Sequence, residues 1–549
     1  MGIFILNKFK LITQVDYFAM LFIATISAIL LTFVCYRLFQ ILQLSGYKSK
    51  GYFSWFKETK GAYFSRLLML TFLSTAAVLI TNVLLNQFFT VKAFEYVSVL
   101  FIILFDSFFI FILFSKKQKT PLKYTKRMTR LIITNFIVTF LIVFTLEIVG
   151  FAFIPYLSFG LLCITPTLLS IIVIVSHIIN LPIEKIISNY YLKKSVQKIS
   201  SFKKLKVIGI TGSFGKTTLK NILLKILSEK YKVCATPENY NTPHGLSKTI
   251  LNNLTEEDEV FIAEMGARYK GDIDKLCKMV SPTLGIITGV GNQHLMTFGS
   301  VENIIKTKAE LADYVTNNNG ELFVNIDSKN AKTLADGYKN AYLISILGQN
   351  DLKFDNIETN INGSTFDISY NGDTEKVYTS LVGEHNISNL YLACCVSIKL
   401  GLTIQDIKNG IEKLTPIPHR LEVIKSNSPY VIIDDSYNCS VEGSFASLKF
   451  LSKFDGQKIV ITPGIVELGK EQYEANFELG KNLAKVCSYV IINSQTNYKA
   501  ICDGLDFEKF ESSKIIFTTN LSDAVEKLNT IANKGDVVLF ENDLPDNYN

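Results

Sequence analysis

A glycine-containing turn between an apolar run and a helical pattern is the stretch of this sequence best suited to chemistry. Residues 206–227 read KVIGITGSFGKTTLKNILLKIL, where β-branched residues predict a strand and helically spaced apolar residues predict a helix. Gly212 and Gly215 allow backbone N–H groups to converge on an anion at the start of this helix. In such a turn Lys216 reaches the β- and γ-phosphates of a nucleotide, and the Thr217 hydroxyl coordinates Mg²⁺. The pattern therefore predicts a site for ATP and magnesium.

The spacing of this turn departs from the usual phosphate loop, in which four residues separate the first glycine from Gly-Lys. Gly209 lies one residue too early for that role. A strand-to-helix turn that binds nothing is the alternative interpretation. Strand, lysine, paired threonines and helix occur in register, which favours the phosphate site. Its predicted nucleotide-binding residues are Thr211, Gly212, Ser213, Gly215, Lys216, Thr217 and Thr218.

The composition divides the chain into two unlike parts. With 549 residues it is too long for one hydrophobic core and should contain about three or four domains. Residues 1–200 carry 20 Lys or Arg against 6 Asp or Glu, whereas the remainder carries 36 against 43. The net charge of +7 averages these parts and does not indicate nucleic-acid binding. The nine cysteines show no C-x-x-C pair and no disulfide-like spacing, which is typical of a reducing compartment.

Apolar stretches long enough to cross a membrane precede the phosphate loop. A membrane span needs about 20 apolar residues. Five stretches qualify, near residues 17–36, 67–89, 96–114, 131–151 and 156–179. We therefore expect a bundle of about five transmembrane helices within residues 1–182. The first stretch is too long for a signal-peptide core and has no evident cleavage site, so we expect it to be an anchor.

Basic loops predict the orientation of this bundle. Residues 115–130, between the third and fourth stretches, carry seven Lys or Arg and no acid. The loop after the first stretch is also mainly basic. By the positive-inside rule both loops are cytoplasmic, which places the amino terminus outside and everything after the fifth span in the cytoplasm. Lys8 and Lys10 favour the opposite orientation but are outnumbered.

An amphipathic juxtamembrane linker helix is predicted at residues 183–202, after the last span. Apolar or aromatic residues recur there at helical spacing with lysines among them, namely Ile183, Ile186, Ile187, Tyr190, Tyr191, Lys185, Lys193, Lys194 and Lys198. A helix of this kind lies along the inner leaflet of a membrane. A rigid linker helix is the alternative interpretation.

The variant loop and several later stretches resemble the Mur ligases, the ATP-dependent amide ligases of cell-wall peptide assembly. The stretch FIAEMGARYKGDIDKLCKMVSPTLGIITGVGNQHLMTFGS is similar, nearly word for word, to the MurF type, which adds D-alanyl-D-alanine to a UDP-N-acetylmuramoyl-tripeptide. Each motif alone is modest, but together they cover about residues 203–540. The other matching stretches are TPENYNTPHGLSKTIL (236–251), LVGEHNISNLYLA (381–393), PHRLEVI (418–424), IDDSYN (433–438) and VELG (466–469).

The resemblance implies metal ligands in the first half of the matched region. Glu264 ends an apolar strand, where an acid faces the Mg²⁺ bound to nucleotide phosphates. His294 resembles the histidine that ligates a second metal ion. Lys308 matches a lysine that becomes carbamylated in some members, which gives a carboxylate-like metal ligand; a solvated helix lysine is the alternative. With Thr217, these residues make one or two Mg²⁺ sites.

The resemblance also implies nucleotide contacts further along the chain. His385, Asn386 and Asn389 look like the family's nucleotide-contacting motif on a helix. Arg420 matches the arginine that joins the γ-phosphate region from the domain boundary. Asp435 matches an acid near the nucleotide, and Asn438 lies in the same loop. The catalytic residues implied by the resemblance are Lys216, His294, Lys308 and Arg420.

The predicted architecture is a multidomain chain: an α-helical transmembrane bundle followed by two α/β domains. Residues 203–415 form the central P-loop ATP-binding domain of a Mur ligase. Residues 416–549, where strands such as YVIID and DVVLF alternate with helices, form a Rossmann-like C-terminal domain. In the family this second domain closes over ATP and excludes water from a hydrolysable intermediate.

The resemblance implies a reaction in which a carboxylate attacks the γ-phosphate of ATP and the acyl phosphate then reacts with an amine. The usual N-terminal domain that recognises a UDP-sugar is replaced by the membrane stretches. We therefore hypothesise a membrane lipid and a cell-wall precursor, lipid-linked at the inner leaflet of a bacterial plasma membrane, as partners. A membrane protein of the cell-wall machinery is a further expected partner. The amine is an amino acid or a dipeptide, because ITPGIVELG departs from the family's usual run.

Two other functions remain open from the sequence. A capsule ligase that polymerises an amino acid, such as a poly-γ-glutamate synthase, also pairs membrane segments with a similar ATP site. An ATP-driven transporter or signalling protein is the second alternative. The long match at residues 261–300 favours the cell-wall ligase over both.

Overall fold

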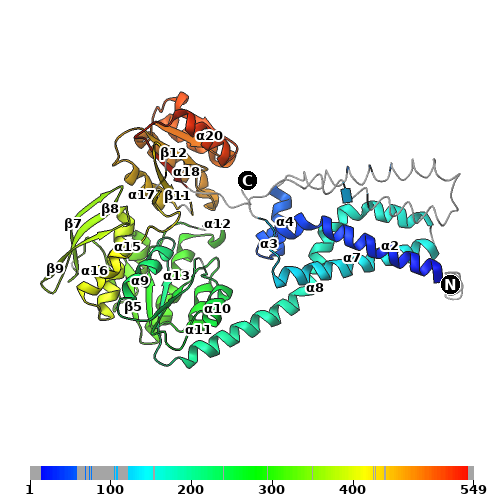
Figure 1. Cartoon of the computed structure of the whole chain (residues 1–549), viewed down its shortest axis with the longest axis horizontal. Coiled ribbons are helices and arrows are strands. Elements are labelled where there is room, and N and C mark those ends of the chain that lie inside the picture. Colours follow the sequence, from blue (N-terminus) through cyan, green and yellow to red (C-terminus); the bar gives the residue numbers. More distant parts are fainter. Residues whose placement is uncertain are drawn as a thin grey trace. The chain divides into compact units, whose positions relative to one another are not determined.

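A computed structural model describes residues 14–58, 121–152 and 155–541, with a few isolated residues between the first two ranges (Figure 1). Seven residues inside the last range are not described, and these are Asn239, His294, Gln349, Lys425, Asn427, Asn438 and Cys439. The described chain forms two compact units, Met1–Ser188 and Asn189–Asn549. The spans predicted near 67–89 and 96–114 lie outside the described residues, apart from isolated positions.

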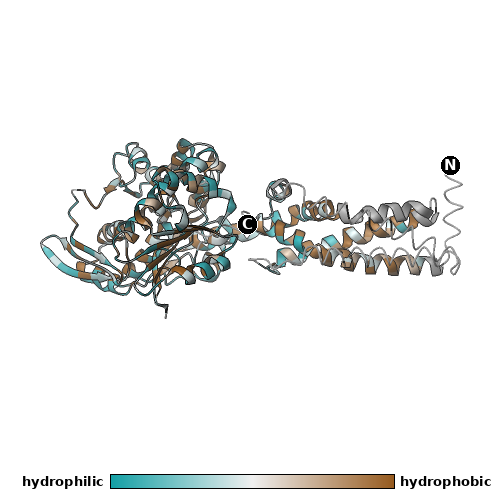
Figure 2. Ribbon diagram, turned by 90° about the horizontal axis from the view of Figure 1, so that it is seen from above, coloured by the Kyte–Doolittle hydropathy of each residue, from teal (hydrophilic) through white to brown (hydrophobic). Residues whose placement is uncertain are grey.

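The described part of the first unit is helical. Its helices are α2 (Gln14–Val34), α3 (Tyr36–Leu44), α4 (Ser49–Glu58), α7 (Lys126–Ala152) and most of α8 (Pro155–Ser201). Within the described residues, three segments are long and apolar enough to cross a membrane, namely Tyr17–Val34, Lys126–Val149 and Leu168–Ser201. These segments include most of the first and fourth predicted stretches and part of the fifth. Hydrophobic residues dominate these helices (Figure 2), and many are exposed, as Phe18 and Phe22 are at 67% and 63%.

The last span and the predicted linker helix form one continuous helix. Residues 183–201 are helical and continue α8, which begins at Pro155, without a break. At the end of α8, Ile199 is buried in the core of the second unit, with Leu192 packed against it. Ser247 donates a hydrogen bond to the Tyr191 carbonyl over 3.1 Å. One face of this end of α8 therefore packs against the core of the second unit, as expected for a rigid linker helix.

A six-stranded parallel sheet forms the centre of the first α/β domain. Its strands lie in the order β2 (Val233–Ala235), β3 (Val260–Glu264), β1 (Lys206–Thr211), β4 (Leu284–Ile287), β5 (Glu321–Asn325) and β6 (Tyr342–Ile344). The central strands are apolar along their length because helices cover both faces of such a sheet. These helices are α9 (Lys216–Leu227), α10 (Pro243–Asn252), α11 (Asp272–Val280), α12 (Leu295–Phe298), α13 (Val301–Asn317) and α14 (Lys329–Ala335).

An antiparallel sheet and two helices complete this domain. The sheet consists of β7 (Lys353–Asn360), β8 (Gly363–Tyr370) and β9 (Asp373–Thr379). The helices α15 (Glu384–Lys399) and α16 (Ile404–Glu412) follow it. They share one hydrophobic core with α9 and the central strands, in which Leu219, Leu390 and Ile407 are fully buried. This core fixes α9, and with it the residues at the start of α9.

A second six-stranded sheet forms the C-terminal domain. Its order is β10 (Glu422–Ile424), β11 (Val431–Asp435), β15 (Val537–Glu541), β12 (Lys458–Thr462), β13 (Tyr489–Ile492) and β14 (Ile515–Phe517). Only β10 pairs in an antiparallel manner, which agrees with the predicted mostly parallel Rossmann-like sheet. The helices are α17 (Val441–Leu451), α18 (Gln472–Val486), α19 (Gln495–Phe507) and α20 (Leu521–Ile531), with short 3₁₀ turns at Gly469–Glu471 and Ser512–Lys514.

Strand register sets the position of the functional site. Strands β1 and β3 pair in parallel, and Ile210 is the partner of Glu264 in this ladder. Both strands therefore end at the same edge of the sheet, where Thr211 leads into the glycine turn. The carboxylate of Glu264 and the predicted phosphate loop are brought together by this register rather than by any local sequence feature.

Candidate active site

The glycine turn has the geometry of an anion-binding loop. Gly212 and Gly215 have φ angles of +157° and +78°, which L side chains rarely adopt. A Cβ atom on Gly212 would lie 2.1 Å from the Thr288 hydroxyl, and one on Gly215 would lie 2.8 Å from the Asn389 side-chain oxygen. Gly215 is also the N-cap of α9, where backbone N–H groups are free to meet phosphate oxygens. Glycine is required at both positions.

Lys216 folds back over this turn. Its Nζ atom donates hydrogen bonds to the carbonyls of Gly212 (2.7 Å) and Ser213 (3.0 Å). Burial lowers the pKa of the Lys216 ammonium to about 8; Glu264 opposes this shift and the positive charge of Arg420 adds to it. A phosphate group beside Lys216 would raise this pKa again and so favour the charged form.

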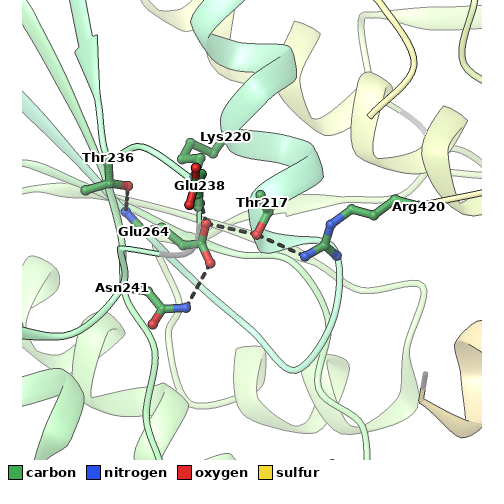
Figure 3. Close-up of polar contacts among 7 residues, drawn as sticks. All are labelled: Thr217, Lys220, Thr236, Glu238, Asn241, Glu264 and Arg420. Carbon is green, nitrogen blue, oxygen red and sulfur yellow. Dashed lines mark hydrogen bonds and ion pairs between the residues drawn. The ribbon is translucent and has the colours of Figure 1, made fainter. Parts of the chain in front are cut away.

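Glu264 is the centre of a hydrogen-bond network (Figure 3). Its side chain is only 1% exposed. The Thr217 hydroxyl donates to Oε2 over 3.0 Å, and the Asn241 amide donates to Oε1 over 3.1 Å. Its backbone N–H donates to the Thr236 hydroxyl over 3.1 Å. Burial alone would raise the pKa of Glu264, but Lys220 and Lys216 lower it below its usual value, so the carboxylate is ionised.

Lys220 is the partner of Glu264 that sequence reasoning missed. It lies one turn after Thr217 on α9, and its side chain is 1% exposed. Its Nζ lies 3.1 Å from Glu264 Oε2 and also donates to the Glu238 carbonyl. The available signal was its position, because residues three apart on a helix share one face. Asn241, the other missed partner of Glu264, lies in the stretch TPENYNTPHGLSKTIL (236–251).

Arg420 reaches the site from the boundary between the two α/β domains. Its Nη2 donates to the Thr217 hydroxyl over 3.3 Å, across 203 residues of sequence. The guanidinium lies 4.3 Å from the ring centroid of Tyr437, close enough for a cation–π contact. The structure therefore brings together Lys216, Thr217, Glu264 and Arg420, all of which were predicted.

The predicted nucleotide-contacting motif on α15 consists of His385, Asn386 and Asn389, and these side chains have different surroundings. Asn389 lies against Gly215, at the glycine turn. Asn386 is buried and donates its amide to the Val382 carbonyl over 2.8 Å, so its side chain holds its own helix start. The buried His385 Nδ1 has no hydrogen-bond partner among the described residues. Burial lowers the pKa of His385, and the negative charge of Asp435 partly opposes this.

Asp435 holds the segment that carries Arg420. It accepts a hydrogen bond from the Leu421 backbone N–H over 3.0 Å and another from the Ser447 hydroxyl. Burial raises the pKa of Asp435, while the Ser447 hydrogen bond and the charge of His385 lower it in part. The hydrogen bond from Leu421 thus fixes the backbone next to Arg420.

Lys308 is buried rather than solvated. Its side chain lies on α13 and is 4% exposed, so the alternative of a solvated helix lysine is wrong. Burial, together with repulsion from Lys216, lowers the pKa of the Lys308 amine to about 7. With this pKa, about half of the Lys308 amine is neutral near pH 7, and the neutral form is the one that reacts with carbon dioxide. His294 and Asn438, the other predicted residues of this region, lie outside the described residues.

The remaining predicted loop residues support the turn. The Thr211 hydroxyl donates to the Met265 carbonyl and the Ser213 hydroxyl to the Gly291 carbonyl, each over 3.1 Å. Thr218 is buried in α9. At the carboxyl end of β5, Asn325 donates to the Ser388 hydroxyl over 3.0 Å, which ties this strand to α15. These contacts hold the glycine turn between β1, β4 and α15.

The donors around the turn fit a nucleotide with Mg²⁺. Among the described residues, no group of three or more His, Cys, Asp or Glu side chains is placed to hold a metal ion. Glu264 and the Thr217 hydroxyl are oxygen donors in contact with one another. Mg²⁺ is usually held by one or two carboxylates together with substrate phosphates and water. The residues therefore fit an ion that is shared with a nucleotide.

Both α/β domains match known domains. Residues 210–397 match the Mur ligase middle domain, and residues 419–541 match the Mur ligase, glutamate ligase domain. Together the two matches cover more than half of the chain. Residues of both regions meet at the glycine turn, as the contact between Arg420 and Thr217 shows.

The similar proteins are peptide-adding enzymes. The UDP-N-acetylmuramoyl-tripeptide--D-alanyl-D-alanine ligase of Bacillus subtilis (strain 168) is 28% identical over 353 residues, 61% of this chain and 72% of that enzyme. The Haemophilus influenzae enzyme of the same name is 29% identical over 294 residues, 52% of this chain and 64% of the relative. The structure of the MurF ligase from Thermotoga maritima in complex with ADP gives a TM-score of 0.58 at 29% identity. It covers 65% of this chain and 80% of that one.

A phosphate loop completed by an arginine from a second α/β domain, with both domains matching those of ligases, defines an ATP-dependent ligase. The chain belongs to the Mur ligase family, and its similarities lie with the MurF branch. The predicted family is thereby confirmed. These matches do not support the alternative of an ATP-driven transporter or signalling protein.

The pKa of Lys216 predicts how nucleotide binding depends on pH. Below about pH 8 the Lys216 ammonium is charged and attracts phosphate; above it, binding must first restore the proton. We expect ADP affinity to fall by up to about tenfold for each pH unit above 8, because one proton is taken up. Isothermal titration of wild type and Lys216→Met measures this. The variant should bind more weakly and lack this dependence; an equal slope in both proteins would contradict the assignment.

Proposed function

We propose that this chain is a membrane-anchored, ATP-dependent amide ligase of cell-wall precursor synthesis. It would join the carboxylate of a precursor to the amine of an amino acid or dipeptide. One observation carries the proposal: Lys216, Glu264 and Arg420, which come from two domains, converge on the same glycine turn. Positive side chains gathered around a phosphate loop are suited to a reaction in which negative charge moves between phosphate oxygens.

The proposed reaction follows from this arrangement. The acceptor carboxylate attacks the γ-phosphate of ATP and forms an acyl phosphate and ADP. The amine then attacks the acyl carbon, and phosphate leaves from the tetrahedral intermediate. Lys216 and Arg420 orient the phosphates and balance their charge, while Glu264 and Thr217 hold Mg²⁺, which stabilises the transferred phosphoryl group when bound. No nucleophile from the protein is needed.

Contacts between the two α/β domains support the exclusion of water from this reaction. The Met296 backbone N–H donates to the Glu467 carbonyl over 3.2 Å, and Asn292 donates to Glu471 over 3.2 Å. A third contact between the two domains is the ion pair of Lys449 Nζ with Glu384 Oε2, over 2.6 Å. Because Arg420 meets Thr217 only when the domains are together, domain closure and assembly of the site are the same event.

The proposed substrates go beyond the domain matches. The similar enzymes are named as UDP-N-acetylmuramoyl-tripeptide--D-alanyl-D-alanine ligases. We propose the same class of substrate here, with a lipid-linked acceptor as the preferred form because three described helices before the ligase domains are long and apolar enough to cross a membrane. The capsule-type alternative would instead add the same amino acid repeatedly.

We propose that the helical unit is inserted in the bacterial plasma membrane with the ligase domains in the cytoplasm. The described basic side chains of this unit gather at one end of the long helices. Gln43, after α2, donates to the Lys123 carbonyl, just before α7, and Arg130 pairs with Glu184 of α8 over 2.7 Å. By the positive-inside rule this end is cytoplasmic. The basic side chains are Arg37, Lys48, Lys50, Lys123, Lys126, Arg127, Arg130 and Lys185.

Lys308 is proposed to carry a carbamate that ligates a second Mg²⁺. Its amine has a pKa of about 7, so a large fraction is neutral and nucleophilic at pH 7.5. Incubation with ¹³C-labelled bicarbonate should give one carbamate signal in the ¹³C NMR spectrum of the wild type and none in Lys308→Arg. Lys306, on the same helix and nearer the surface, provides the control, because Lys306→Arg should keep the signal. A wild-type spectrum without a carbamate would refute this role.

The main test of the function uses Lys216→Ala and Arg420→Ala. Both variants should remain in the membrane fraction and resist extraction with carbonate. Lys216→Ala should abolish ADP-forming amide synthesis, and Arg420→Ala should reduce it about 100- to 1,000-fold, as for loss of one group that stabilises transition-state charge. Mass spectrometry of the product and an ADP assay measure both. Full amide formation in Lys216→Ala would refute the assignment.

The acceptor can be determined by supplying lipid-linked and UDP-linked muramoyl peptides in parallel. We expect the lipid-linked acceptor to give the higher kcat/KM with the full chain in membranes, and a product with a single added unit. Strict preference for the UDP-linked acceptor would contradict the lipid-linked part of the proposal alone. A ladder of added residues would favour the capsule-type ligase.

A further inference from the structure

Three positive side chains lie around Thr217 and Glu264. Two of them are Lys216 and Lys220, whose charges act on Glu264. The third is Arg420, which donates a hydrogen bond to the Thr217 hydroxyl. Glu264 pairs directly with Lys220 over 3.1 Å, whereas the carboxylates of Glu238 and Asp435 act on Lys220 and Arg420 by charge alone. A divalent cation that ligates Glu264 in the nucleotide-free protein must therefore approach three positive side chains.

The oxygens of Glu264 are already engaged in this state. Oε2 accepts from Thr217 and from Lys220, and Oε1 accepts from Asn241. Of these donors, only Lys220 brings a full positive charge. A cation that ligates Oε2 displaces neutral donors easily but must compete with the Lys220 ammonium.

Lys220 has little freedom to move away from Glu264. Both side chains are 1% exposed, and a charge buried without its partner is strongly destabilising. The neighbouring residues Leu219, Ile222 and Leu223 are fully buried in the core, which fixes this part of α9. The second hydrogen bond of Lys220, to the Glu238 carbonyl, holds the ammonium from the opposite side.

We propose that Lys220 is the permanent counter-ion of Glu264 and prevents a divalent cation from binding until nucleotide phosphates supply negative charge. The proposal rests on the proposed function only in taking ATP and Mg²⁺ as the ligands of this site. Lys220 acts through Glu264 and is a positioning residue. Without Lys220, the nucleotide-free protein would contain a buried carboxylate that lacks a charged partner. Lys220 therefore stabilises the nucleotide-free protein, and it makes metal binding dependent on the nucleotide.

A purely structural role for Lys220 makes the opposite prediction. If Lys220 only held Glu264 in place, its removal would weaken metal binding with or without nucleotide. If it is a competing cation, its removal should strengthen metal binding to the nucleotide-free protein. The sign of the change therefore distinguishes the two roles.

The test is a titration of the full chain in detergent with Mn²⁺, followed by electron paramagnetic resonance, with and without ADP. The wild type should bind Mn²⁺ at this site only with ADP. Lys220→Met should bind Mn²⁺ without ADP at least about tenfold more tightly than the wild type. Lys225→Met, an exposed lysine on the same helix, is the matched control and should behave as the wild type.

Two results would overturn the proposal. One is Mn²⁺ binding to the nucleotide-free wild type as tight as binding in the presence of ADP, with the site abolished by Glu264→Gln. The other is a folded Lys220→Met protein that gains no nucleotide-independent Mn²⁺ binding. A wild type that binds Mn²⁺ and ADP together but makes no amide would refute the proposed function and leave this inference standing.

The double variant Lys220→Met/Glu264→Gln guards against misfolding of the single variant. It replaces the ion pair with two neutral side chains, so neither buried charge is left alone. It should fold and bind ADP, but Mn²⁺ should bind this site neither with nor without ADP beyond the contribution of the nucleotide itself. Should Lys220→Met fail to fold, the wild-type titration and this variant decide the proposal: a double variant that retains full site affinity for Mn²⁺ with ADP contradicts it.

Discussion

The buried ion pair between Lys220 and Glu264 is the interaction on which the active site depends. It joins the first turns of α9 to the end of β3, and its neighbours Thr217 and Asn241 complete the coordination of the carboxylate. Removing one partner of such a pair typically costs about 3–5 kcal/mol, because the other charge stays buried. The pair therefore stabilises the fold and fixes the oxygen that faces the phosphate loop at the same time.

This arrangement explains why the site uses two domains. The first domain alone supplies the glycine turn, Lys216 and Glu264. Arg420 comes from the boundary with the second domain, and Asp435 fixes the backbone beside it. The second domain thus adds a positive charge beside the Thr217 hydroxyl at the start of α9. The enzyme's task is to position charge, since the chemistry takes place between substrates.

The helical unit and the ligase domains differ in where their apolar side chains lie. In the first α/β domain, the last turns of α8 pack against the core, so the chain enters the ligase region through a helix that is fixed there. Exposed apolar side chains on α2 and α7 suit a lipid environment, whereas the ligase domains bury theirs in parallel sheets.

The sequence by itself determined the α/β class of both ligase domains, the glycine turn and the family, because apolar runs, glycines and short motifs report local structure. It also pointed to Lys216, Glu264 and Arg420. Only the tertiary structure showed that Lys220 pairs with Glu264, 44 residues away, that Lys308 is buried and that Asp435 contacts Leu421. It also showed that α8 continues past residue 182. Strand register and core packing decide such partners, and neither leaves a periodic signal in the sequence.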